Sequence, residues 1–164
     1  MELKLYPKAW MYKSWRRFFF IAALWNFAGA VPSLIYPEFS LRLFYRLPVA
    51  DFYVVSLNTV FWAAVLIFGI GYLFVAKRPG RNLGILVMGV LAKIGVAVFW
   101  YQLFSIDRAS IVALLAGIGD VLFTLYFLYY LMGGPREPEQ ATVETGAQEE
   151  ESFGRPTGEE KAEG

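Results

Sequence analysis

The sequence predicts an all-α membrane protein, a four-transmembrane-helix bundle, from its composition and from the length of its apolar runs. Of the 164 residues, 57% are hydrophobic and 18% are aromatic, which is more apolar than an ordinary soluble domain. A helix needs about 20 mostly apolar residues to cross the hydrocarbon core of a bilayer. Four runs meet that requirement and leave no room for a second folded domain: residues 18–36, 52–76, 82–104 and 109–132.

The first run follows a juxtamembrane segment, residues 1–17, that is rich in basic and aromatic side chains. Pro32 is expected to kink or end the first helix, because proline lacks an N–H group and clashes with the preceding turn. A basic start before an apolar stretch also resembles a cleavable signal peptide. Trp25 and Asn26 interrupt the apolar stretch, and this favours a retained span.

Residues 38–47 predict a short amphipathic helix on the outer membrane interface, between the first two spans. Charged side chains recur there at every fourth position, and apolar side chains fall on the opposing side. The charged set is Glu38, Arg42 and Arg46, and the apolar set is Phe39, Leu43, Phe44 and Leu47. Alternation of apolar residues between positions 41 and 47 also fits a strand, but an isolated strand edge at a membrane surface is disfavoured.

Turn signals separate the later runs and end the last one. Pro79 and Gly80 stand between the second and third runs, and Gly133, Gly134 and Pro135 follow the fourth. The tail, residues 133–164, carries 9 Asp/Glu against 3 Lys/Arg and has few apolar residues. Because it cannot bury enough surface to offset the entropy of ordering, we predict a disordered acidic tail.

The charge distribution predicts the topology. Residues 1–132 carry 12 Lys/Arg and 5 Asp/Glu, with basic residues concentrated before the first run and in the loop that holds Lys77, Arg78 and Arg81. Basic residues mark the cytoplasmic side, so both termini are expected to be cytoplasmic in a multi-pass protein of a bacterial inner (plasma) membrane. The basic excess suits a bilayer with anionic head groups and not nucleic acid.

Lys93 and Asp120 are the main candidates for a functional site. Each is the single charge in its run, and each lies near the middle, so two antiparallel spans place opposite charges at about the same depth. A charge at the bilayer centre costs roughly 2.5–3.5 kcal/mol on insertion scales and needs a partner. The pair is either a packing device that sets how the helices meet, or a proton relay or substrate counter-ion.

Other polar and aromatic side chains within the spans are candidate pocket-lining residues. They are Asn26, Asn58, Trp62, Tyr72, Asn82 and Thr124. The alternative is that these residues, together with stripes of small residues, only form the seams along which helices pack in lipid. Trp100, near the end of the third run, is expected to be an interfacial anchor.

The sequence carries no catalytic signature. The chain has no cysteine and no histidine, which excludes disulfides, Cys/His zinc sites, Fe–S clusters and histidine-ligated haem within it. No phosphate-binding loop, nucleophile elbow or carboxylate cluster occurs, so we expect no metal, no cofactor and no independent catalysis.

Two functional hypotheses follow. The first is a small accessory or assembly subunit that packs in a larger membrane complex or as a homo-oligomer. The alternative is a binder of a small molecule such as a lipid or quinone, or a proton-coupled transporter, centred on Lys93 and Asp120. Co-purification in a larger complex favours the first, and a monomer or homo-oligomer with bound lipid favours the second.

The layout resembles the DoxX-like group of small four-helix bacterial membrane proteins. The resemblance rests on four spans in about 130 residues, the basic start, and short motifs at residues 68–72, 81–82, 89–93 and 119–120. It implies the four-helix fold, and some members are tied to quinone-linked oxidation or to stress responses. It provides no catalytic residue that could be assigned here.

Overall fold

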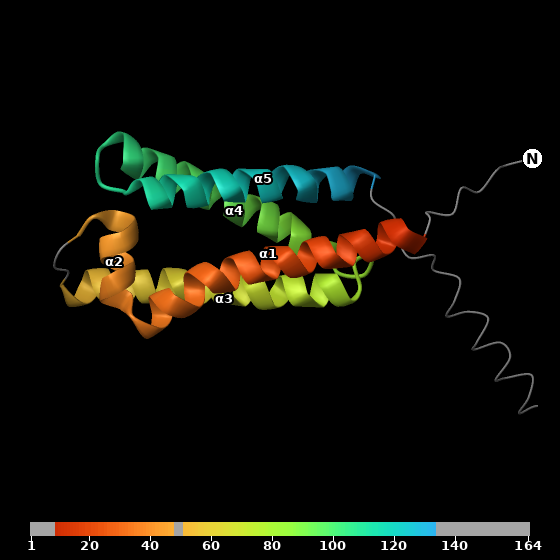
Figure 1. Cartoon of the computed structure of the whole chain (residues 1–164), viewed down its shortest axis with the longest axis horizontal. Helices are drawn as coiled ribbons and strands as arrows, with labels where there is room; N and C mark the ends of the chain where they lie inside the picture. The colour runs from red at the N-terminus through yellow and green to blue at the C-terminus, as the bar shows by residue number, and fades with distance from the viewer. Residues whose placement is uncertain (1–8, 48–50, 134–164) are drawn as a thin grey trace, which may run out of the picture.

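The computed structural model describes residues 9–47 and 51–133, and within them it contains five α-helices and no strand (Figure 1). The expectations for residues 1–8 and for the acidic tail beyond residue 133 lie outside the described residues. Four of the helices are long and apolar enough to cross a membrane, and a short one lies between the first two of these. The expected all-α bundle with four candidate spans is therefore confirmed.

The four long helices are α1 (Ala9–Ile35), α3 (Phe52–Lys77), α4 (Leu83–Ser105) and α5 (Ile111–Gly133). Their bounds agree closely with the apolar runs, except that α1 begins well before residue 18. Its apolar candidate span begins at Lys13, so Lys13, Arg16 and Arg17 of the basic segment belong to the same helix as the first apolar run. Polar residues extend a helix readily once its apolar part is packed.

Pro32 does not end α1, which continues to Ile35. A proline in the last turn removes one backbone donor from a helix whose remaining hydrogen bonds stay in place. The N–H of Tyr36 still donates to the carbonyl of Pro32 at 2.9 Å. The helix ends before Pro37, where Tyr36 has φ −129° and ψ 73°, because a residue that precedes proline avoids the helical region.

The long helices form two tightly packed antiparallel pairs, α1 with α3 and α4 with α5 (Figure 1). Glycines allow the close approach within each pair. A Cβ added to Gly69 of α3 would come within 2.5 Å of the Phe27 ring of α1. A Cβ added to Gly117 of α5 would lie 3.6 Å from Cα of Ala97 on α4.

Aromatic side chains fill the space between the two pairs where α1 begins and α5 ends. The ring centroids of Trp15 and Tyr130 lie 4.8 Å apart, and those of Phe18 and Tyr126 lie 5.1 Å apart. Because these rings are large, the axes of α1 and α5 lie further apart than the helix axes within the α1–α3 pair or the α4–α5 pair. At the opposite end a second apolar cluster contains Phe44, Trp62 and Trp100.

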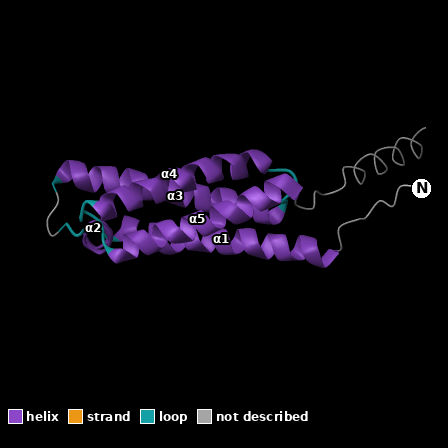
Figure 2. Ribbon diagram, turned by 90° about the horizontal axis from the view of Figure 1, so that it is seen from above, coloured by secondary structure: helices purple, strands orange, loops and turns teal. Residues whose placement is uncertain are grey.

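The short helix α2 (Pro37–Tyr45) covers that second end of the bundle (Figures 1 and 2). Pro37 occupies its first turn, and Arg46 ends it in the left-handed conformation with φ 52°. An ion pair joins Arg46 to Asp107, and the N–H of Ser110 donates to the carbonyl of Phe44 at 2.9 Å. The end of α2 is therefore attached to the loop between α4 and α5.

The helical prediction for residues 38–47 is confirmed, and the strand alternative is wrong. The buried face differs in part from the expected one. Leu41 and Phe44 are buried against the bundle, whereas Phe39 is 57% exposed. A hydrogen bond at 2.9 Å from Nδ2 of Asn58 to Oγ of Ser40 helps to set this rotation.

Candidate functional site

The two helix pairs enclose a cavity of about 320 Å³ on the side of the bundle nearer α2. All five helices contribute to its wall, and most of the wall is apolar. It is lined by Trp25, Asn26, Ala28 and Gly29 of α1, Phe44 of α2, Phe61, Trp62 and Val65 of α3, Val96 and Trp100 of α4, and Val112, Leu115, Ala116 and Asp120 of α5. This volume lies near the lower limit of the roughly 300–1,000 Å³ typical of small-molecule sites.

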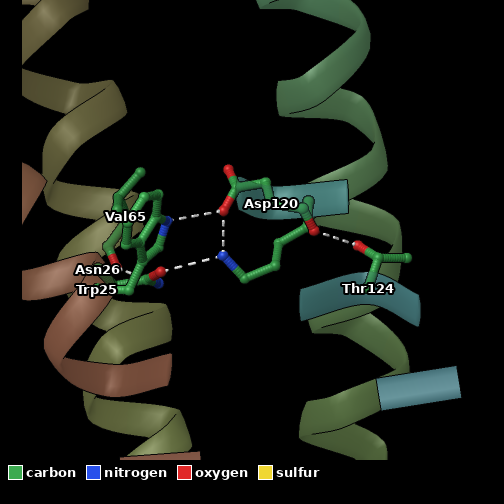
Figure 3. Close-up of polar contacts among 6 residues, drawn as sticks. Trp25, Asn26, Val65, Asp120 and Thr124 are labelled. Atoms are coloured by element: carbon green, nitrogen blue, oxygen red, sulfur yellow. Dashed lines mark hydrogen bonds and ion pairs between the residues drawn. The ribbon is translucent and has the colours of Figure 1, made fainter. Parts of the chain in front are cut away.

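Asp120 lies at the polar end of this cavity and forms an ion pair with Lys93. Figure 3 shows the polar contacts around Asp120. Nζ of Lys93 on α4 lies 2.5 Å from Oδ1 of Asp120 on α5. The two side chains are 6% and 12% exposed, so water screens the pair little. The sequence placed both charges at a similar depth, and the packing of α4 against α5 brings them into contact.

Two side chains of α1 complete the polar cluster. Oδ1 of Asn26 accepts a hydrogen bond from Lys93 at 3.2 Å, and Nδ2 of Asn26 donates to the carbonyl of Val65 at 3.1 Å. The second bond orients the amide so that its oxygen faces the ammonium group. Nε1 of Trp25 donates to Oδ1 of Asp120 at 3.3 Å. The cluster therefore links α1 and α3 to the α4–α5 pair.

Aromatic rings surround the ammonium group of Lys93. Nζ lies 5.4 Å from the ring centroid of Phe123 and 5.8 Å from that of Tyr72. The negative faces of such rings stabilise a cation by about 0.5–2 kcal/mol. Lys93 is thus held by a carboxylate, an amide oxygen and two rings, and it is not among the residues that line the cavity.

Asp120 is the charged group that the cavity exposes to a ligand. Its Oδ1 accepts from both Trp25 and Lys93, while its other carboxylate oxygen points away from the lysine (Figure 3). Because Lys93 balances its charge, the polar end is close to neutral overall. Such a site suits a neutral group that donates a hydrogen bond.

The exposed part of the cavity lining belongs to α1 and α5. Trp25 is 40% exposed, Val112 37% and Leu115 57%. The cavity therefore opens on the side of the bundle between α1 and α5, where lipid tails surround a spanning helix. Gly119 makes room for this arrangement, because a Cβ there would overlap the Trp25 indole.

The remaining pocket candidates take other places. Asn58 accepts from Nε1 of Trp62 at 3.0 Å and joins α3 to α2, so only Trp62 of these two lines the cavity. Nδ2 of Asn82 donates to the carbonyl of Phe74 at 3.2 Å near the start of α4, away from the site. Oγ1 of Thr124 donates to the backbone carbonyl of Asp120 at 2.8 Å within α5. Tyr72 lies beside Lys93 but outside the cavity lining.

The pocket-lining candidates named from the sequence did not include Trp25, Phe44 or Trp100, although all three line the cavity. Trp100 is 2% exposed, so its assignment as an interfacial anchor is wrong. Phe44 covers it, with 5.7 Å between their ring centroids, and this contact exists only because α2 folds over the end of the bundle. Trp25 was the one of these residues that the sequence could have indicated, because it is a tryptophan near the middle of a span and beside Asn26.

Comparison with known proteins finds no matching family model, no matching curated protein and no matching solved structure.

Proposed function

We propose that this small integral membrane protein binds a neutral, lipid-soluble molecule in the cavity that ends at Asp120. The observation that carries the proposal is a buried carboxylate facing an apolar cavity whose mouth opens sideways between α1 and α5. A charged group within a span is a functional-site candidate because its burial is costly. Here it is combined with the apolar wall and few polar groups that typify small-molecule sites.

The chemistry of the polar end limits the ligand. A hydroxyl group can donate to the Asp120 oxygen that points away from Lys93, while an alkyl or ring portion occupies the apolar wall. A carboxylate ligand would be repelled by Asp120. Lipid alcohols and reduced quinones belong to the favoured class, and the proposed DoxX-like relationship, with its quinone-linked members, agrees with the second.

Binding is better supported than proton-coupled transport. Among the described residues, the hydrogen bonds of the two charged side chains extend to Trp25, Asn26 and the Val65 carbonyl, and Tyr72 is a titratable side chain that contacts Lys93 through its ring. Proton pathways usually need a chain of such groups. The accessory-subunit role stays a prediction, because apolar outer faces suit lipid and partner helices equally.

We also propose that the protein resides in a bacterial inner membrane with the basic end of the bundle on the cytoplasmic side. The basic end is defined by Lys13, Arg16, Arg17, Lys77, Arg78 and Arg81. α1 begins and α5 ends there (Figure 1). The positive-inside rule supports this orientation.

The test uses bromoundecanol, a neutral alcohol whose bromine quenches tryptophan fluorescence. We expect saturable quenching in the purified protein, because Trp25, Trp62 and Trp100 line the cavity. Ala116→Phe fills the cavity and should weaken binding by about tenfold or more, in line with the steric cost of overpacking. Ala64→Phe, on an exposed position of α3, is the matched control and should leave binding unchanged.

Equal quenching in both variants would show that the probe only partitions into detergent around the helices, and the proposal would fail. Equal binding of bromoundecanoate would contradict the inferred preference for a neutral head group. Purification as a stable complex with another membrane protein, with no saturable quenching, would support the accessory-subunit role instead.

A further inference from the structure

A second amphipathic surface lies at the basic end of the bundle, far from Asp120. α1 and α3 frame a shallow groove there, with basic side chains at one end and apolar side chains along its length. Lys13, Arg17 and Lys77 supply charge, and Phe20, Ile21 and Leu73 supply apolar surface. None of the lining residues is acidic.

The order of these residues along the helices matches the order of layers in a bilayer. Lys13, Arg17 and Ile21 recur at every fourth position of α1 and share one face. Leu73 and Lys77 stand in the same relation on α3. Because a helix rises 1.5 Å per residue, consecutive members of each series lie about 6 Å apart along the helix axis. The groove thus changes from cationic to apolar over the distance that separates head groups from acyl chains.

Arg16 gives the groove a defined wall. Its Nε donates to the carbonyl of Ala76 at 3.1 Å. That carbonyl is in the last turn of α3, where carbonyls lack partners within the helix. The bond attaches the start of α1 to the end of α3. Arg17 and Lys77, which are the neighbours of the two bonded residues, therefore keep a fixed position relative to each other.

We infer that this groove binds one anionic phospholipid. Lys13, Arg17 and Lys77 contact its phosphate, and Phe20, Ile21 and Leu73 contact an acyl chain. Phe20 and Ile21 are 49% and 55% exposed, so a chain can reach them from the membrane. Basic clusters beside a span attract anionic head groups. The apolar continuation of the groove favours a lipid over free phosphate.

This inference is independent of the cavity proposal, because the two sites share no lining residue. The test measures binding of phosphatidylglycerol and phosphatidylcholine to the full-length protein by native mass spectrometry. The groove variant is Arg17→Gln with Lys77→Gln, which leaves the Arg16 bond intact. The control is Arg78→Gln with Arg81→Gln, which removes the same charge from the same end of the bundle, outside the groove.

We expect the groove variant to lose about tenfold in affinity for phosphatidylglycerol and most of its preference over phosphatidylcholine. The control should stay within about twofold of the natural sequence. Equal losses in both variants would mean diffuse attraction to surface charge, and no loss in either would mean that the groove holds no lipid. Competition by soluble glycerol phosphate would assign the site to free phosphate and overturn the inference.

A second measurement tests the inference in the natural protein, in case the groove variant fails to fold. A photoactivatable phosphatidylglycerol, added to the natural protein, should crosslink to peptides that contain residues 13–21 or 73–77. Crosslinks confined to α4 and α5 would contradict the inference. The bromoundecanol titration should be unaffected by the groove variant, so failure of one proposal leaves the other standing.

Discussion

Removing one member of the Lys93–Asp120 pair should destabilise the bundle more than removing both. Breaking a buried ion pair costs about 3–5 kcal/mol, because the remaining charge stays in a low-dielectric environment. Replacing the whole pair with apolar residues of similar size is often neutral or stabilising by about 1–4 kcal/mol. The perturbation is therefore a cycle of Lys93→Met, Asp120→Leu and the double variant.

The structure also predicts an asymmetry between the single variants. After Asp120→Leu, Lys93 keeps the oxygen of Asn26 and the two rings, each contact worth about 0.5–2 kcal/mol. After Lys93→Met, Asp120 keeps only one side-chain donor among the described contacts, Nε1 of Trp25 at 3.3 Å. We expect the free energy of unfolding to fall by about 3 kcal/mol in Asp120→Leu and by about 5 kcal/mol in Lys93→Met, from the range for broken buried pairs.

Unfolding in mixed micelles with rising denaturing detergent measures these differences, and bromoundecanol quenching measures the effect on the site. The double variant should be as stable as the natural protein and should lose the hydroxyl preference. Single variants with natural stability would refute the pairing argument. A double variant weaker than both single variants would refute the claim that the orphaned charge causes the loss.

Three further predictions follow from the packing, from Tyr45 and from the charges. Gly69→Ala should lose about 1–3 kcal/mol in the same unfolding assay, because its Cβ would meet the Phe27 ring, whereas Gly95→Ala, with open space, should be neutral or stabilising. Burial raises the pKa of Tyr45 from 10.0 to about 12. The unfolded chain therefore releases this proton at a lower pH than the folded chain, so the stability that neutral Tyr45 contributes is complete below pH 10 and should be lost between pH 10 and 12. The loss should be smaller in Tyr45→Phe. Equal dependence of stability on pH in the two proteins would contradict this. A reporter fused after residue 80 should be active in the cytoplasm and one after residue 108 in the periplasm, and the reverse pattern would overturn the orientation.

The spans and the pairing of charges were readable from the sequence because both depend on properties of single segments. An apolar run of sufficient length has few options in a bilayer other than a helix. Lys93 and Asp120 lie near the centres of two adjacent runs, so depth alone indicated that they could meet. The helical character of residues 38–47 likewise followed from their local periodicity.

The cavity, its sideways mouth and the burial of Trp100 depended on how the helices rotate and pack. Lipid tails are about as apolar as leucine, so hydropathy does not distinguish a residue that faces lipid from one that faces protein. Asn26 and Asn82 therefore looked equivalent in the sequence, yet Asn26 contacts Lys93, whereas Asn82 precedes the distant start of α4 and donates to the carbonyl of Phe74. The rotation that separates them comes from glycine contacts within each pair, from aromatic spacing between the pairs, and from the attachment of α2 to the α4–α5 loop.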